Sequence, residues 1–136
     1  MARYLALIDF ADGQYGVAFP DAPGCTAMGS TQEEAIRNAA EALAEWIGDE
    51  LADGRKPPRP SAVPKILADK QVGRALAKGA ILAFVPLVRD TGKLARANIS
   101  IDAGLLADID ETARRGGVTR SAFLAAAARE KIKASA

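Results

Sequence analysis

The sequence predicts an α+β protein in two parts: an N-terminal β-β-β-α-β domain and a C-terminal β-α-α segment. Short alternating apolar runs, separated by Gly and Pro turns, occupy residues 4–29 and predict strands. A capped pattern with helical periodicity follows them. The charge also changes sign along the chain, because residues 1–56 hold 4 Lys+Arg against 10 Asp+Glu, whereas residues 57–136 hold 14 against 7. The two parts should therefore bind oppositely charged partners.

The first three strands are predicted from alternation and turn residues. Tyr4 to Asp9 alternates apolar side chains between two faces, and Ala11-Asp12-Gly13 predicts a hairpin turn before a second strand at 14–19. The proline-rich turn PDAPG at 20–24 precedes a short third strand at 25–29.

The long helix has a well-marked start. Ser30 with Glu33, and Thr31 with Glu34, form two overlapping capping boxes, and the helix should run to about Ala52. Its apolar positions predict one face packed on the sheet, and its acidic positions predict one exposed face. The apolar set is Ile36, Ala39, Ala40, Leu43, Trp46, Ile47 and Leu51, and the acidic set is Glu33, Glu41, Glu45 and Asp49.

After Asp53-Gly54, three prolines make RKPPRP at 55–60 an extended linker. Helical spacing at 61–68 and 70–77, interrupted by Gly73, is followed by a buried strand at 80–88 that returns to the sheet. Polar, turn-forming residues then predict a boundary. The predicted parts are a domain at 1–89, a linker at 90–93 and a second domain at 94–136.

The C-terminal part is too small to fold alone, because its 43 residues contain only one candidate strand, at 94–101. Pairing with the same strand of a second chain would give the backbone N–H and C=O groups of that strand their hydrogen-bond partners, so we expect a two-fold dimer. Asp102 should cap a helix at 103–115 that ends at Gly116-Gly117, and Thr119 should cap another at 120–133. The residues expected to point inward are Leu105, Leu106, Ile109, Ala113, Phe123, Leu124, Ala127 and Ile132.

Composition lowers the expectation of catalysis. The chain has no His, which removes the commonest general base and metal ligand, and its single Cys25 is expected to be a small buried residue. We expect neither a metal nor a cofactor. The longest apolar stretch, 80–88, is too short to cross a bilayer, and the N-terminus lacks the uninterrupted apolar core of a signal peptide, so a cytoplasmic location is expected.

The segment RANISIDAGLLADIDETARRGGVTRSAFLAAAARE resembles the ribbon-helix-helix family of DNA-binding proteins over residues 94–136. The resemblance implies that paired strands enter the major groove of double-stranded operator DNA, with Arg96, Asn98 and Ser100 facing the bases. Arg suits guanine, Asn suits adenine, and Ser can donate or accept at either base. The alternative is a solvated polar strand face.

Phosphate contacts are expected at the start of the last helix. Free backbone N–H groups at Thr119, Arg120 and Ser121 would make an anion site there, although helix capping explains Thr119 equally well. Lys93, Arg114 and Arg115 are further candidates for phosphate contacts, although each is explained equally well as an ordinary surface charge.

The segment GQYGVAFPDAPGC, followed by the capped acidic helix, resembles the HicB antitoxin domain; with AILAFVPL the resemblance reaches residue 88. Gln14 stands where a second Gly is common. The resemblance implies a partial RNase H-like domain that masks a small basic RNA-cleaving toxin, HicA. Asp21, Glu41 and Glu45 are the candidate toxin contacts.

Two other functions remain open from the sequence. Asp9 on the first strand, with Glu41 or Glu45, could be a metal-dependent nuclease site, although several acids on one helix are usually a solvated face. The chain could also be a stand-alone transcription factor whose N-terminal domain senses a ligand or oligomerises. The preferred interpretation is a non-catalytic antitoxin that also represses its own operon. Whether its dimers join into tetramers is left open.

Overall fold

The computed structural model describes residues 1–90 and 92–135, and the chain divides into two compact units. Met1–Arg89 form the first unit, together with the C-terminal residues from Ile132, and Asp90–Lys131 form the second. No helix in the described ranges is both long and apolar enough to cross a membrane.

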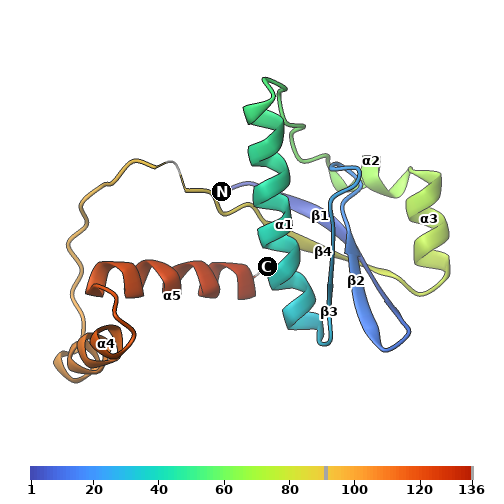
Figure 1. Cartoon of the computed structure of the whole chain (residues 1–136). Helices are drawn as coiled ribbons and strands as arrows, with labels where there is room; N and C mark the ends of the chain where they lie inside the picture. The colour runs from blue at the N-terminus through green and yellow to red at the C-terminus, as the bar shows by residue number, and fades with distance from the viewer. Residues whose placement is uncertain (91, 136) are drawn as a thin grey trace. The chain divides into compact units, whose positions relative to one another are not determined.

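The first unit is a four-stranded antiparallel sheet with helices on both faces (Figure 1). The strand order is β3-β2-β1-β4, so β3 and β4 are the two edges. Two short helices, α2 and α3, lie between α1 and β4 and are absent from the β-β-β-α-β order. The elements are β1 (Arg3–Ala11), β2 (Gln14–Ala18), β3 (Thr26–Gly29), α1 (Gln32–Ala52), α2 (Val63–Leu67), α3 (Lys70–Ala77) and β4 (Ile81–Pro86).

The hairpin between β1 and β2 is as tight as the sequence predicts. Ala11 pairs with Gln14, and the two residues between them, Asp12 and Gly13, have φ of 54° and 75°. These left-handed values suit Asp and Gly, and the turn that they make matches the twist of the flanking strands.

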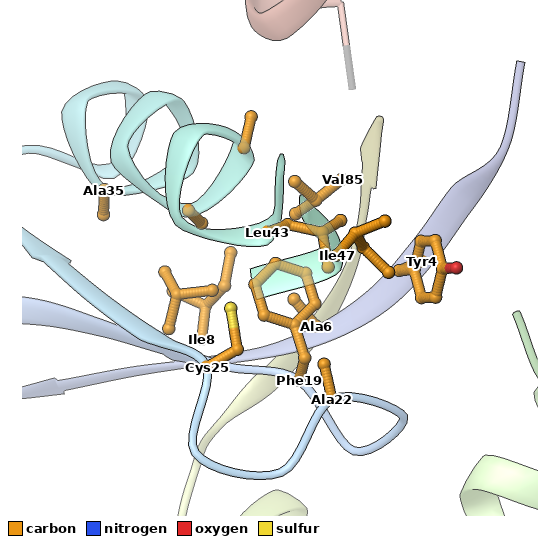
Figure 2. Packing of buried hydrophobic residues seen from close by; sticks show 13 residues of the cluster. Tyr4, Ala6, Ile8, Phe19, Ala22, Cys25, Ala35, Leu43, Ile47 and Val85 are labelled. Atoms are coloured by element: carbon orange, nitrogen blue, oxygen red, sulfur yellow. The ribbon is translucent and has the colours of Figure 1, made fainter. Parts of the chain in front are cut away.

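The main core lies between α1 and one face of the sheet. Tyr4, Ala6 and Ile8 of β1 point to this face and pack against Leu43 and Ile47 of α1, as Figure 2 shows. The helix lies very close to the sheet where it begins. A Cβ added at Gly29 would be 2.4 Å from the backbone nitrogen of Ala35, so only glycine fits there.

A smaller core lies on the opposite face, where Leu5 packs with Ile66 of α2 and Val72 of α3. These helices cover the β1–β4 half of the face only. In the other half Met28 of β3 is 60% exposed. On one side α1 covers most of the sheet but leaves Phe10, near the end of β1, 62% exposed, and on the other side α2 and α3 cover part of it.

The start of α1 confirms one of the two predicted capping boxes. Thr31 is the N-cap, and its Oγ1 accepts a hydrogen bond from the Glu34 backbone N–H at 3.1 Å. The Glu34 carboxylate accepts from the backbone N–H of Ser30 at 3.1 Å and from the Ser30 hydroxyl. These bonds, with the Ser30 hydroxyl contributing most, lower the pKa of Glu34.

Several packing predictions were wrong in detail. Leu51 is 43% exposed, because the last turn of α1 extends beyond the sheet, and Leu105 is 52% exposed. Gly73 does not interrupt α3, which is continuous across it. The third strand begins at Thr26, since Cys25 still belongs to the preceding turn, where its N–H donates to Ala22 O at 3.0 Å.

The second unit contains α4 (Ala103–Arg115) and the start of α5 (Arg120–Ala134). Asp102 caps α4 by accepting from the Leu105 N–H at 3.1 Å, and Thr119 caps α5 by accepting from the Ala122 N–H at 3.1 Å, as predicted. Residues 94–101 are extended but do not form a strand with any described part of this single chain (Figure 1). The predicted strand needs a second chain and stays a prediction.

Candidate partner-binding and DNA-binding surfaces

The outer face of α1 is acidic. Glu41, Glu45 and Asp49 are all exposed and follow one another at intervals of four residues, so they line one stripe of the helix. The buried residues of α1 are on its other side, against the sheet. Two of the predicted toxin-binding residues, Glu41 and Glu45, therefore share this stripe. Glu41 pairs with Lys133 of α5 at 3.2 Å, and Glu45 is exposed on the same side of the helix.

Asp21, the third predicted toxin contact, is held within the fold. Its carboxylate accepts hydrogen bonds from the backbone N–H and the hydroxyl of Ser61, both at 2.7 Å. The Tyr4 hydroxyl donates to the Pro58 carbonyl at 2.7 Å, so the segment at 58–61 is tied both to β1 and to the turn before β3. Neither contact is apparent from the sequence, because Asp21 and Ser61 are 40 residues apart and Tyr4 and Pro58 are 54 residues apart.

The residues considered for a nuclease site are not brought together. Asp9 pairs with Gly16 across the hairpin and points, like Leu5, to the face opposite α1. A Cβ on Gly16 would be 2.6 Å from Asp9 Oδ1, which places the carboxylate over that glycine. Glu41 and Glu45 are on α1, which packs on the other face. Among the described residues no group of three His, Cys, Asp or Glu side chains could hold a metal ion.

The predicted base-contacting residues Arg96, Asn98 and Ser100 are exposed in the extended stretch before α4. This stretch borders a hollow of 370 Å³ lined by Ile99, Ser100, Ile101, Leu106, Arg120 and Leu124. Ile99 remains 64% exposed. The extended stretch thus presents apolar side chains that nothing within the second unit covers fully.

The predicted phosphate contacts are near the start of α5. The Thr119 hydroxyl caps α5 by accepting from the Ala122 N–H, and Ser121 is exposed. Arg120 donates two hydrogen bonds to the Asp110 carboxylate, both at 2.7 Å, and this pairing lowers the pKa of Asp110. Arg120 therefore connects α4 to α5, a role that the sequence did not signal. Lys93 is exposed in the stretch before residue 94.

Comparisons with known proteins agree with this architecture. A family model described as HicB_like antitoxin of bacterial toxin-antitoxin system matches residues 4–128. A relative from Haemophilus phage HP1 (strain HP1c1), named an uncharacterized 14.9 kDa protein in the rep-hol intergenic region, is 30% identical over 108 residues, or 79% of each protein.

Two solved structures are similar to this chain, one over nearly its whole length and one over about two thirds of it. The crystal structure of the Burkholderia pseudomallei antitoxin HicB has a TM-score of 0.56 and 31% identity, covering 97% of this chain and 99% of that one. A chain of the HicA3 and HicB3 toxin-antitoxin complex has a TM-score of 0.52 and 29% identity, covering 65% of this chain and 98% of that one.

Proposed function

This chain belongs to the HicB-like antitoxin family, and we propose on that basis that it is a non-catalytic antitoxin that binds and neutralises a HicA-type RNA-cleaving toxin. The observation that carries the proposal is the family match over residues 4–128, which spans the sheet, α4 and the first part of α5. A similar chain occurs in a complex named for HicA3 and HicB3. The proposed place of action is the bacterial cytoplasm.

The acidic face of α1 is the proposed toxin-binding surface. An RNA-cleaving protein must present a basic surface to its substrate, and carboxylates can occupy that surface in place of RNA phosphates. Residues 1–56 hold 10 Asp+Glu against 4 Lys+Arg, with Glu41, Glu45 and Asp49 exposed together. Inhibition needs no chemistry in this arrangement, because a partial RNase H-like sheet serves only to support the helix.

Co-expression tests the antitoxin function. The gene beside this chain's should encode a small basic protein that arrests growth when expressed alone, and this chain should restore growth and co-purify with that protein. Growth arrest that persists while the two soluble proteins fail to associate would disprove the proposal.

The second proposed activity is operator binding by a ribbon-helix-helix dimer, which represses the shared operon. Its support is physical: residues 94–101 are extended, and Ile99 is 64% exposed beside an apolar hollow. The same stretch of a second chain would pair with the backbone and cover these side chains. Residues 57–136 also carry the positive charge that DNA requires.

Ile99→Asp tests the dimer, because it would place an unpaired charge in the proposed interface. Light scattering should show the wild-type chain as a dimer or a larger even-numbered assembly, and the variant as a smaller species that has lost operator binding. A monomeric wild-type chain at micromolar concentration would contradict the ribbon.

A further inference from the structure

A small hollow lies beside the acidic face of α1, next to the turn that precedes β3. Its volume is 200 Å³, and it borders the main core at Cys25. Gly24, Cys25 and Thr26 form one side of it, and Ala42, Glu45, Trp46 and Asp49 of α1 form the other.

The walls of the hollow are aromatic and acidic. Trp46 is half-buried, with one side packed on the main core, so its indole is held in place. Glu45 and Asp49 are exposed at the rim, and neither carboxylate has a hydrogen bond or an ion pair with a side chain or backbone N–H of the described residues. An aromatic ring beside two carboxylates that have no partner attracts a cation.

The floor of the hollow is uncharged. Cys25 is buried, and Figure 2 shows its sulfur pointing toward the helix, between Ile8 and Phe19. Burial, with a smaller effect from the Glu45 charge, raises the pKa of the Cys25 thiol. The thiol therefore stays neutral and does not supply a charge to the hollow, so Glu45 and Asp49 determine its sign.

We propose that this hollow is the seat for one arginine side chain of the basic protein partner, with the guanidinium against the Trp46 indole and paired with Glu45 and Asp49. The proposal rests on the antitoxin function for the identity of the partner. It goes further by naming the contact: a single buried cation at the centre of the acidic face. Arginine fits better than lysine, because its planar guanidinium stacks on aromatic rings and pairs with carboxylates through two N–H groups.

Residues buried in a pocket with both aromatic and charged contacts usually dominate the binding energy of a protein interface. Rim charges mainly steer association, whereas a seated ion pair slows dissociation. Loss of a seated arginine should therefore raise the dissociation rate. This separates the proposal from a general attraction between acidic and basic surfaces.

The first test uses the chain's own fluorescence, because Trp46 is its single tryptophan. The full-length chain is titrated with the tripeptide Gly-Arg-Gly, and with Gly-citrulline-Gly as a neutral peptide of nearly the same shape. We expect a saturable change in Trp46 emission with the arginine peptide, and half-saturation at about tenfold higher concentration for the citrulline peptide and for Asp49→Asn, as expected when about 1.4 kcal/mol is lost.

Asp12→Asn is the matched control, because it removes the same charge in the hairpin turn, where Asn also accepts a left-handed φ. Its titration should match the wild type. Equal responses to the two peptides, no arginine response at all, or an equal effect of both substitutions would overturn the proposed seat.

The second test measures the kinetics of binding to the toxin encoded beside this chain. Asp49→Asn and Glu45→Gln should each raise the dissociation rate about tenfold, while Asp12→Asn leaves it unchanged. If the wild-type chain binds the toxin and these variants dissociate at the wild-type rate, the seat is wrong and the antitoxin function stands. If the wild-type chain does not bind the toxin, the antitoxin function fails, and the peptide titration alone decides whether the seat exists.

Discussion

At the scale of single residues, Asp21 ties two distant segments of the first unit together, and its contact with a toxin stays a prediction. Its two hydrogen bonds to Ser61 fix the chain between α1 and α2 against the turn before β3. A half-buried carboxylate with two short donors is a structural feature, and its removal leaves both donors without a partner. The turn and the linker should therefore loosen together when either side is changed.

Asp21→Ala should lower the free energy of unfolding by about 1 to 3 kcal/mol. Ser61→Ala should cost less, because it removes only the hydroxyl donor and leaves the backbone donor in place. Urea denaturation of the two single variants and the double variant measures the coupling. Costs that simply add would mean that the two residues do not interact in the folded protein.

Glu34 predicts a pH dependence. Its folded pKa is lowered from 4.5, mainly by the Ser30 hydroxyl, so the folded state favours the ionised carboxylate. The stabilisation is complete above pH 4.5 and is lost as the pH falls through the folded pKa. Glu34→Gln should therefore reduce stability at pH 7 and show a weaker loss on acidification, as measured by the urea midpoint at pH 7 and pH 3. A parallel pH dependence in both proteins would contradict the cap.

At the scale of elements, Gly29 determines how closely α1 approaches β3. A Cβ at Gly29 would meet the α1 backbone at 2.4 Å, and backbone cannot move aside as a flexible side chain can. Gly48, in the same helix, has nothing within 4 Å of its hypothetical Cβ. The two positions form a matched pair for the same substitution.

Gly29→Ala should destabilise the fold by about 1 to 3 kcal/mol through overpacking, because α1 must move off the sheet. Gly48→Ala should stabilise it by about 0.5 to 1 kcal/mol, because alanine loses less conformational freedom than glycine in a helix. Thermal unfolding should show a lower melting temperature for Gly29→Ala and a higher one for Gly48→Ala. A tolerated alanine at Gly29 would mean that the helix does not approach the strand this closely.

The C-terminal segment offers a second pair. Asn98→Ala should lower operator affinity by about 1 to 3 kcal/mol per base contact and reduce the preference for the operator over a scrambled sequence. Thr119→Ala removes the cap of α5 and should weaken binding to both sequences by similar factors. Fluorescence anisotropy at fixed salt measures both, with circular dichroism to show that the variants are folded. Unchanged discrimination by folded Asn98→Ala would mean that the ribbon does not recognise the bases.

At the scale of the whole molecule, local signals in the sequence predicted the elements well and long-range contacts poorly. Alternation, turn glycines and capping residues act within a few positions, so the hairpin at Asp12-Gly13 and the caps at Thr31, Asp102 and Thr119 were predictable. The Asp21–Ser61 tether depends on the folded path of the linker.

The candidate site divides in the same way. Helical spacing alone placed Glu41 and Glu45 on one exposed stripe of α1. Helical spacing could not reveal the hollow beside Trp46, because the opposite wall of that hollow is the turn at Cys25, 21 positions earlier in the sequence. Likewise, nothing local shows that Arg120 pairs with Asp110. Residues 94–101 depend on a second chain, so neither the sequence nor one chain determines their pairing.

The central claim is that this chain neutralises a HicA-type toxin by binding to it, and a cleavage assay tests that claim most directly. The purified toxin encoded beside this chain is mixed with labelled RNA, and the full-length chain is titrated into the reaction. Cleavage should fall linearly to zero as the two proteins reach equivalence, and Asp12→Asn should inhibit as the wild type does. Undiminished cleavage in the presence of a several-fold excess of folded chain would contradict the account.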